Sequence, residues 1–282
     1  MKIAIGICAY NEEKNIGKLI KSIQKQRTKH EISEIIIVSS GSTDNTNKIV
    51  KLFNDNRINL IIQENREGKS KAINLLLKEA KSDIIILISA DVLPDINAFE
   101  NIANSFTKDI GIVSTRLIPL NSKKKIIGFA VHLLWNLHHD INLLSPKYGE
   151  CIGFRNIINE IPISAVDEEE IASIILKQFK GKYVPNAIIY NHGPENFKDF
   201  IKQRRRIYAG HLELSKRKNY ETPTLNNKLV IKMTLKRLKL KEFFKVITAV
   251  FLEAYSRLLG YKDFRLNKNH STWEISKSTK QL

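Results

Sequence analysis

Two segments of small and polar residues stand directly after apolar runs of strand length. Ala9-Tyr10-Asn11-Glu12-Glu13 follows residues 2–8, and a Ser-Ser-Gly-Ser-Thr-Asp-Asn-Thr segment at 39–46 follows residues 34–38. A small-residue turn that opens a helix offers free backbone N–H groups to an anion, and the carboxyl edge of a parallel sheet is where such ligands bind. Taken alone, each segment is also explained as a glycine turn with a helix cap.

Two further segments bring charge to the same edge. Residues 65–70 read Asn-Arg-Glu-Gly-Lys-Ser, and Ser89-Ala90-Asp91 closes the fourth apolar run. The first is not a P-loop, because Gln63 stands where that motif requires glycine, and no Gly-x-Gly-x-x-Gly follows the first run. The carboxylate of Asp91 is suited to hold a divalent cation against phosphates, although an Asp at this place is also typical of a turn.

The elements that must position these segments alternate along the chain. Nearly continuous apolar runs at 2–8, 34–38, 58–62 and 84–88 predict buried, parallel strands. Between them, helical periodicity predicts helices at 12–26, 45–53 and 70–80, which together indicate βαβ architecture. Further on, the pattern predicts a strand at 111–115 and helices at about 126–144 and 168–179.

The last third of the chain has a different composition. The turn at His192-Gly193-Pro194 predicts the main boundary, followed by basic amphipathic helices at about 197–218, 228–239 and 242–259. Residues 198–282 hold 21 Lys and Arg against 7 Asp and Glu, which is most of the net charge of +17. A basic region of this kind favours binding to phosphates, either on nucleic acid or on an anionic membrane surface, and charge alone does not distinguish these two partners.

The helix expected at 242–259 is apolar but interrupted by Lys245, Glu253 and Arg257, which argues against a membrane span. An amphipathic helix lying on a membrane fits this pattern, with the apolar side chains of Phe243, Phe244, Ile247, Phe251 and Leu258 toward lipid. Packing on the rest of the chain, or in a homodimer, fits equally well.

The two cysteines, Cys8 and Cys151, indicate neither a disulfide framework nor a paired-cysteine zinc site. The adjacent His138 and His139 point in different directions on a helix, and no third ligand is spaced to join them. The chain starts without the pattern of a signal peptide. The expected location is cytoplasmic, peripheral on the inner face of the cell membrane.

The four segments after the strands, in their order and spacing, resemble the inverting family-two glycosyltransferases with a GT-A fold. That family's usual pattern is an Ala-Tyr-Asn-Glu strand end, an Asp-Asp-Gly-Ser-Thr-Asp-x-Thr turn, an Asn-x-Gly-Lys segment and an Asp-x-Asp strand end. Ala165-Val166-Asp167 resembles its Glu-Asp segment, and Gln203-Arg204-Arg205-Arg206-Ile207 its Gln-x-x-Arg-Trp motif. The resemblance covers about residues 1–210.

The resemblance implies an α/β, GT-A nucleotide-diphospho-sugar transferase fold: a Rossmann-like mixed, mostly parallel sheet flanked by helices. The catalytic domain would span 1–194, with a donor half at about 1–118 and an acceptor half at about 119–194. Residues 195–282 would form a basic helical extension. The implied activity moves a sugar from a nucleotide-diphosphate donor to a lipid-linked or polysaccharide acceptor, meaning a glycan or a polyprenol-linked glycan.

The resemblance also implies residue roles. Asp91 would ligate Mg²⁺ or Mn²⁺ between the donor phosphates, Asp167 would deprotonate the acceptor hydroxyl, and residues 149–155 would shape the acceptor side. Because Asp167 is followed by three glutamates, a shift of one residue gives the base role to Glu168. The residues expected to bind the donor are Ala9, Tyr10, Asn11, Glu12, Ser39, Ser40, Gly41, Lys69, Asp91, Gln203 and Arg206.

Five positions depart from the family pattern. Ser39 and Ser40 replace the acidic pair that reads the base and ribose, and Ser89 replaces the first acid of Asp-x-Asp. Val166 precedes Asp167 where Glu is usual, and Ile207 replaces the usual Trp. These serines keep a non-catalytic relative open as a hypothesis. A nucleic-acid-binding protein would explain the basic third but not the four strand-end segments, and no aromatic stacking strip accompanies its lysines.

Overall fold

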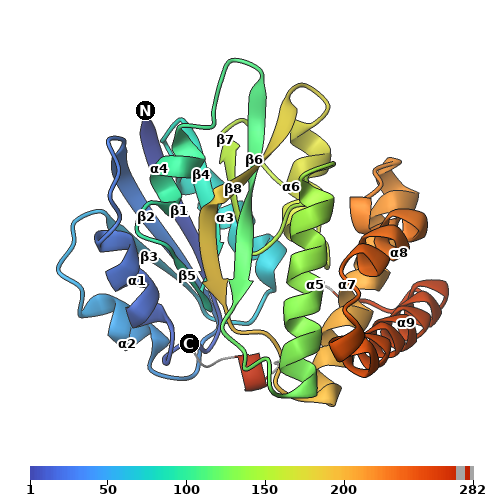
Figure 1. Ribbon diagram of the computed structural model, residues 1–282. Coiled ribbons are helices and arrows are strands. Elements are labelled where there is room, and N and C mark those ends of the chain that lie inside the picture. Colours follow the sequence, from blue (N-terminus) through green and yellow to red (C-terminus); the bar gives the residue numbers. More distant parts are fainter. Residues whose placement is uncertain (271–276, 280–282) are drawn as a thin grey trace.

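The computed structural model describes residues 1–270 and 277–279. It contains an eight-stranded sheet in the order β3-β2-β1-β4-β7-β6-β8-β5 (Figure 1). The strands are β1 (Lys2–Ala9), β2 (Glu31–Ser40), β3 (Ile58–Gln63), β4 (Ile84–Ser89), β5 (Val92–Pro94), β6 (Ile110–Pro119), β7 (Cys151–Arg155) and β8 (Lys180–Asn191). The first four strands are mutually parallel, whereas β7 runs antiparallel to both β4 and β6. The predicted mixed, mostly parallel sheet is confirmed.

Helices cover both faces of this sheet. They are α1 (Ile16–Gln24), α2 (Thr46–Lys51), α3 (Lys69–Glu79), α4 (Ala98–Ala103), α5 (Ile126–Asn142), α6 (Asp167–Ile175), α7 (Phe197–Lys218), α8 (Asn227–Lys236) and α9 (Phe243–Arg265). Three short 3₁₀ segments are η1 (Pro223–Leu225), η2 (Leu240–Glu242) and η3 (Lys277–Thr279).

The sequence of the strands explains why they are central. β1 and β4 read KIAIGICA and IIILIS, and their β-branched side chains are almost all buried on both faces. One core packs α1 and α4 on one face of the sheet, and a second core packs α3 and α6 on the other. Gly6 of β1 permits the close approach of α3, because a Cβ there would lie 2.3 Å from a methyl carbon of Leu76.

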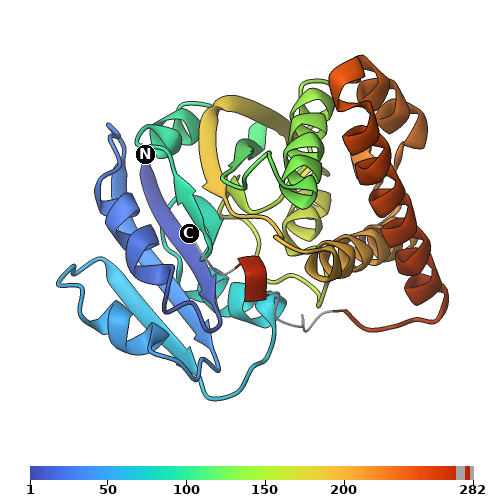
Figure 2. The same ribbon diagram turned by 60° about the horizontal axis from the view of Figure 1, so that its bottom comes forward.

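The C-terminal helices form a third core with α5. Side chains of α7, α8 and α9 pack on α5 through Phe200, Met233, Val246, Ala249 and Leu252 (Figure 2). Between α7 and α9, Arg204 donates two hydrogen bonds to the carboxylate of Glu253, at 2.8 and 2.9 Å. The predicted basic extension therefore packs on the α/β part of the chain. Its separation as a domain at residue 194 stays a prediction.

Several predicted helix ends are wrong. The first helix begins at Ile16 instead of residue 12, because Asn11 adopts a left-handed φ of 52° and the chain turns before it becomes helical. The sixth ends at Ile175 rather than 179, and α8 ends at Lys236 rather than 239. The last helix continues to Arg265, six residues beyond the predicted end at 259, because Gly260 lies against α7 and the helical pattern resumes after it.

Candidate functional site

A cavity of about 610 Å³ lies at the carboxyl ends of β1, β2 and β4, and residues of α7 and α9 also line it. This is the edge at which ligands bind in open α/β sheets. Of the residues expected to bind a donor, eight line it: Ala9, Tyr10, Glu12, Ser40, Lys69, Asp91, Gln203 and Arg206. These side chains come from segments as far apart in sequence as residues 9 and 206, so the fold brings the two ends of the predicted site together.

Three other predicted donor residues do not line this cavity and instead hold its loop in shape. Asn11 accepts a hydrogen bond from the backbone N–H of Thr43 at 2.8 Å, and its own N–H donates to the hydroxyl of Ser42. Ser39 is fully buried and donates to the same hydroxyl. Gly41 has a φ of 68° and leaves no room for a side chain, since a Cβ would lie 2.5 Å from the backbone nitrogen of Arg66.

An aromatic and a guanidinium group form one wall of the cavity. The guanidinium carbon of Arg66 lies 4.1 Å from the ring centroid of Tyr10, which is a cation–π contact. Both residues line the cavity. A flat, polar-edged surface of this kind suits stacking of a nucleobase.

The N-termini of α3 and α6 meet through a buried polar cluster. Lys69 at the start of α3 forms an ion pair with Glu168 at the start of α6. A second contact joins the residue after Lys69 to the residue before Glu168, because the hydroxyl of Ser70 donates to Oδ1 of Asp167. The two carboxylates consequently differ in environment: Asp167 is 0% exposed, whereas Glu168 is 9% exposed and lines a second cavity.

The surroundings also separate the two acids electrostatically. Burial raises the pKa of Asp167 to about 6, although the charge of Lys69 opposes the shift. Burial acts on Glu168 in the same direction, but the charge and the hydrogen bond of Lys69 outweigh it and hold the pKa of Glu168 below its ordinary value. Oδ2 of Asp167 has no hydrogen-bond partner in the described part of the chain. Of these two acids, Glu168 is the one that lines a cavity, and its lowered pKa keeps it ionised at neutral pH.

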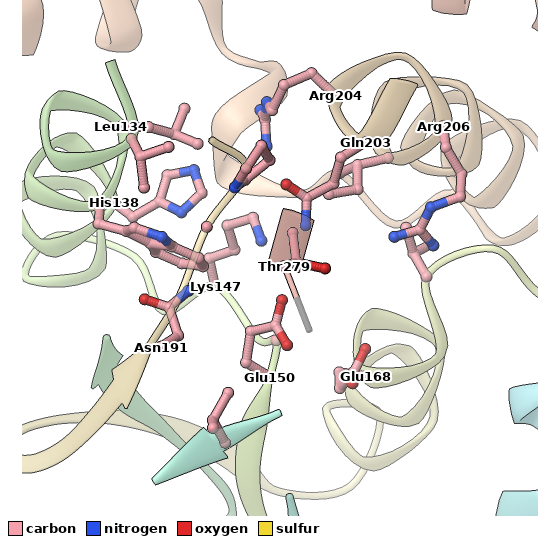
Figure 3. A pocket seen from close by; sticks show the side chains of 18 of the residues that line it. Leu134, His138, Lys147, Glu150, Glu168, Asn191, Gln203, Arg204, Arg206 and Thr279 are labelled. Atoms are coloured by element: carbon pink, nitrogen blue, oxygen red, sulfur yellow. The ribbon is translucent and has the colours of Figure 1, made fainter. Parts of the chain in front are cut away.

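The second cavity, of about 90 Å³, adjoins the first on the side of α5. The two cavities share Lys69, Asp91, Glu150, Gln203, Arg206 and Thr279. Figure 3 shows Glu150 and Glu168 on one side of this cavity, Gln203, Arg204 and Arg206 on the opposite side, and Thr279 between them. The shared side chains form the passage between the two cavities, where groups bound on either side would meet.

Positive charge converges on the smaller cavity. Lys147 lies 3.8 Å from Glu169, and burial lowers the pKa of Lys147. Burial, followed by the charges of Lys147 and Arg204, lowers the pKa of His138 and of His211 well below the ordinary value, so both imidazoles are neutral. Nearby, Oδ1 of Asn191 and Nδ1 of His192 are buried without a hydrogen-bond partner among the described residues. The cavity is thus lined with polar groups that have hydrogen-bonding capacity for a polar ligand.

Glu150 directly precedes β7 and lies beside Ser89, the last residue of β4. Ile88 is paired with Cys151, and the backbone N–H of Ser89 donates to the carbonyl of Glu150 at 2.8 Å. Burial and the neighbouring charge of Asp91 raise the pKa of Glu150 to about 7, and the hydroxyl of Ser89 hydrogen-bonds its side chain. Sequence reasoning placed this residue only among those shaping the acceptor side.

The donor set at this place suits a hard divalent cation. Asp91 and Glu150 offer carboxylate oxygens and Ser89 a hydroxyl, which are the ligand types that Mg²⁺ and Mn²⁺ accept. Among the residues described, no group of three or more His, Cys, Asp and Glu side chains is arranged to hold a metal alone. A cation at Asp91 would therefore take further ligands from bound phosphates or water.

His138 and His139 contact different partners, as expected for adjacent positions on a helix. His138 packs edge-on against Trp135, with ring centroids 5.0 Å apart, and Nδ1 of His139 lies 2.7 Å from the hydroxyl of Tyr183. Arg66 is a cavity residue that sequence reasoning missed, and Glu150 was expected only among residues 149–155 on the acceptor side. The position of Arg66 inside the Asn-Arg-Glu-Gly-Lys segment could have marked it, whereas Glu150 required the antiparallel pairing of β7.

In the described residues, no helix combines the length and the apolar character needed to cross a membrane. The most exposed apolar side chains of α9 are those of Phe244, Phe251 and Leu258, with exposed fractions of 83, 68 and 66%. They lie on the side of the helix opposite the residues that pack on α5 and α7.

Comparison with known sequences gives one family. The sequence profile described as Glycosyl transferase family 2 matches residues 4–152, which is more than half of the chain. The poly-beta-1,6-N-acetyl-D-glucosamine synthase of Staphylococcus aureus strain COL is 27% identical over 233 residues, covering 77% of this chain. This chain spans 56% of the length of that relative.

Solved structures share the fold. The mannosyltransferase PcManGT from Pyrobaculum calidifontis, in complex with GDP-Man and Mn²⁺, superimposes with a TM-score of 0.67 at 17% identity, covering 95% of this chain and 88% of that one. The glucosyl-3-phosphoglycerate synthase of Mycobacterium tuberculosis, in complex with Mn²⁺, uridine diphosphate and phosphoglyceric acid, gives 0.54 at 17% identity, covering 75 and 78%. At these identities the likeness concerns the fold, which agrees with the predicted GT-A class.

Proposed function

The chain belongs to glycosyl transferase family 2, and from this premise we propose that it transfers a sugar from a nucleotide-diphosphate donor to a glycan or polyprenol-linked acceptor, with inversion at the anomeric carbon. The observation that carries the proposal is the passage between the two cavities. Lys69, Asp91 and Arg206 line both cavities there, and Glu168 lines the smaller one. Groups for a diphosphate and a carboxylate base thus meet at one place.

The donor occupies the larger cavity in this proposal. Its base lies against Tyr10 and Arg66, and its phosphates lie toward Lys69 and Arg206. A cation held by Asp91, Mg²⁺ or Mn²⁺, would neutralise charge that develops on the departing diphosphate. The cation–phosphate arrangement is supported by oxygen ligands and positive side chains lining the same cavity.

The acceptor enters the smaller cavity and is activated by Glu168. The acceptor oxygen forms a bond to the anomeric carbon as the bond from that carbon to the diphosphate oxygen breaks, and the hydroxyl proton passes to the Glu168 carboxylate. The diphosphate leaves with the electron pair. Glu168 is favoured over Asp167 because it lines the cavity and its pKa lies below its ordinary value, so it is ionised when the acceptor arrives.

The base assignment is tested by two matched substitutions. Purified protein with Mn²⁺ and a panel of nucleotide-diphosphate sugars should release nucleoside diphosphate, and kcat should fall by about 10²- to 10⁴-fold in Glu168→Gln. Asp167→Asn should retain activity within about tenfold, since that side chain does not reach the cavity. The reverse result, with Asp167→Asn inactive and Glu168→Gln active, would return the base role to Asp167.

We also propose that the protein works at an anionic membrane surface. The support is α9, whose outward apolar side chains include Phe244 and Phe251, beside a basic stretch in and after α8. Apolar side chains flanked by cations fit the boundary between lipid headgroups and acyl chains. A location on the inner face of the cell membrane would place the nucleotide-diphosphate donor and a polyprenol-linked acceptor in one compartment.

A further inference from the structure

The family pattern and this chain differ at the strand end that meets the donor phosphates. The pattern has two acids, Asp-x-Asp, whereas β4 ends in Ser89 and is followed by Ala90 and Asp91. A hydroxyl at position 89 brings no negative charge, so the local sequence of β4 supplies a single carboxylate for a divalent cation.

The residue that precedes β7 supplies the missing group. Cys151, the first residue of β7, faces Ile88 of β4, so Glu150 directly before it lies beside Ser89. The backbone N–H of Ser89 donates to the carbonyl of Glu150 at 2.8 Å, and the two side chains are also hydrogen-bonded. The carboxylate of Glu150 therefore lies next to position 89 and can take the place that an acid at that position would occupy.

The backbone at Glu150 adopts a conformation that a glutamate does not favour. Its φ of 55° lies in the left-handed region, which is unfavourable for a residue other than Gly, Asn or Asp. Gly149, the preceding residue, would fit this conformation more easily. The strained position turns β7 so that Glu150 lines both cavities together with Asp91.

The positive side chains at this place bind other partners. Lys69 forms its ion pair with Glu168, and Arg206 donates to the carbonyl of Ala165 at 2.9 Å. In the part of the chain that the structure describes, Glu150 makes no ion pair within 4.0 Å. The carboxylate of Glu150 therefore acts on Lys69 and Arg206 through longer-range charge interactions and not through a direct ion pair.

We propose that Glu150 and Asp91 together hold the divalent cation, with Glu150 supplying the carboxylate that Ser89 does not provide. The inference rests on the proposed function, because the cation is the one that would bridge the donor phosphates. It also explains the serine at position 89, because Glu150, directly before β7, supplies the second acid of the site.

The test measures cation binding directly. Isothermal titration and the electron paramagnetic resonance signal of Mn²⁺ give its dissociation constant with the protein alone and with uridine diphosphate or guanosine diphosphate present. Glu150→Gln should weaken Mn²⁺ binding by about 10- to 100-fold, on the scale of losing one ligand-shell interaction. Glu64→Gln, an exposed acid near the donor loop, is the matched control and should bind Mn²⁺ as the parent does.

A swap variant separates the specific role from a general loss of charge. In Ser89→Asp/Glu150→Gln, the carboxylate returns to β4, and the Mn²⁺ dissociation constant should recover to within about threefold of the parent value. Thermal melting checks that each variant folds. Undiminished Mn²⁺ binding by Glu150→Gln, or a swap that fails to recover it, overturns the inference.

The outcome is distinguishable from failure of the proposed function. If Mn²⁺ binding depends on Glu150 but no nucleotide-diphosphate sugar is consumed, the proposed cation site is supported and the proposed transferase function is rejected. If sugar transfer proceeds and Glu150→Gln keeps the parent Mn²⁺ affinity, the transferase function is supported and the role of Glu150 in cation binding is rejected.

Discussion

At the scale of residues, two adjacent acids at the start of α6 have opposite environments. Asp167 points beneath the helix to Ser70, and Glu168 points to Lys69 and the cavity. The sequence pattern located this pair within one residue, but four consecutive acids carry no signal for which of them faces the site. Only the packing of α6 on α3 decides it, because helix rotation is set by buried side chains such as Ile171 and Ile175.

The buried carboxyl of Asp167 leads to a prediction about stability. Its native pKa of about 6 lies above the ordinary value of 3.8, so the native state keeps a proton that the unfolded chain loses as pH rises. Stability from this group is therefore full below about pH 4 and is lost between about pH 4 and 6, by about 2–3 kcal/mol. Asp167→Asn removes that dependence.

Urea unfolding of the parent and of Asp167→Asn at pH 4.5 and 7.5 measures this pH dependence of stability. The unfolding free energy of the variant minus that of the parent should be larger at pH 7.5 than at pH 4.5. Asp83→Asn, an exposed carboxylate, is the control. An unfolding difference between the parent and Asp167→Asn that is the same at both pH values would contradict the pKa shift.

At the scale of elements, α9 is attached to α7 by charge as well as by apolar packing. Glu253 accepts hydrogen bonds from Arg204 and from Arg257, and its side chain is 18% exposed. Burial opposes ionisation, but the two arginines outweigh it and lower the pKa of Glu253 to about 2. The helical periodicity predicted α7 and α9 as elements, yet not this pairing, because residues 49 positions apart in sequence give no local pattern.

Removing the shared carboxylate should loosen α9. Glu253→Gln leaves Arg204 buried with a weaker partner, and the free energy of unfolding should fall by about 3 kcal/mol. Amide hydrogen exchange should accelerate in α9 before it does in the sheet. The exposed pair of Lys180 and Asp109 is the comparison, since Asp109→Asn should cost less than about 0.5 kcal/mol. Equal losses in the two variants would show that Glu253 does not tie the helices together.

At the scale of the whole molecule, the sequence predicted four parallel strands of the sheet, but neither their order nor the way β7 enters the sheet. Continuous apolar runs identify buried strands, and four of them gave the parallel half correctly. The residues from Cys151 to Arg155 form a short strand paired on both edges with antiparallel partners, and such pairing is set by tertiary contacts. The role of Glu150 was invisible from sequence for the same reason.

The positive charge of the C-terminal helices predicts that the protein binds anionic lipid membranes. Vesicles containing about 30% phosphatidylglycerol should carry the protein upward in a flotation gradient, whereas phosphatidylcholine vesicles should not, since roughly 1 kcal/mol per nearby Lys or Arg is electrostatic. Phe244→Ser/Phe251→Ser should weaken anionic vesicle binding about tenfold.

Leu52→Ser is the matched control, because Leu52 is 83% exposed, like Phe244, but follows α2. Failure of the parent protein to float with anionic vesicles at any salt concentration rejects the membrane proposal. A dimer in sedimentation that the double substitution dissociates would assign the same apolar side chains of α9 to a homodimer.

Apart from the shared passage, the two cavities draw on different parts of the chain. The larger takes its sheet-edge residues from the first 91 positions and further residues from α7 and α9, whereas the distinctive residues of the smaller, except Val92, come from position 131 onward. Under the proposed function, substitutions at the sheet edge can change the preferred donor without disturbing the acceptor, provided that the shared residues of the passage persist. New pairings of donor and acceptor can then arise by substitutions in one cavity at a time.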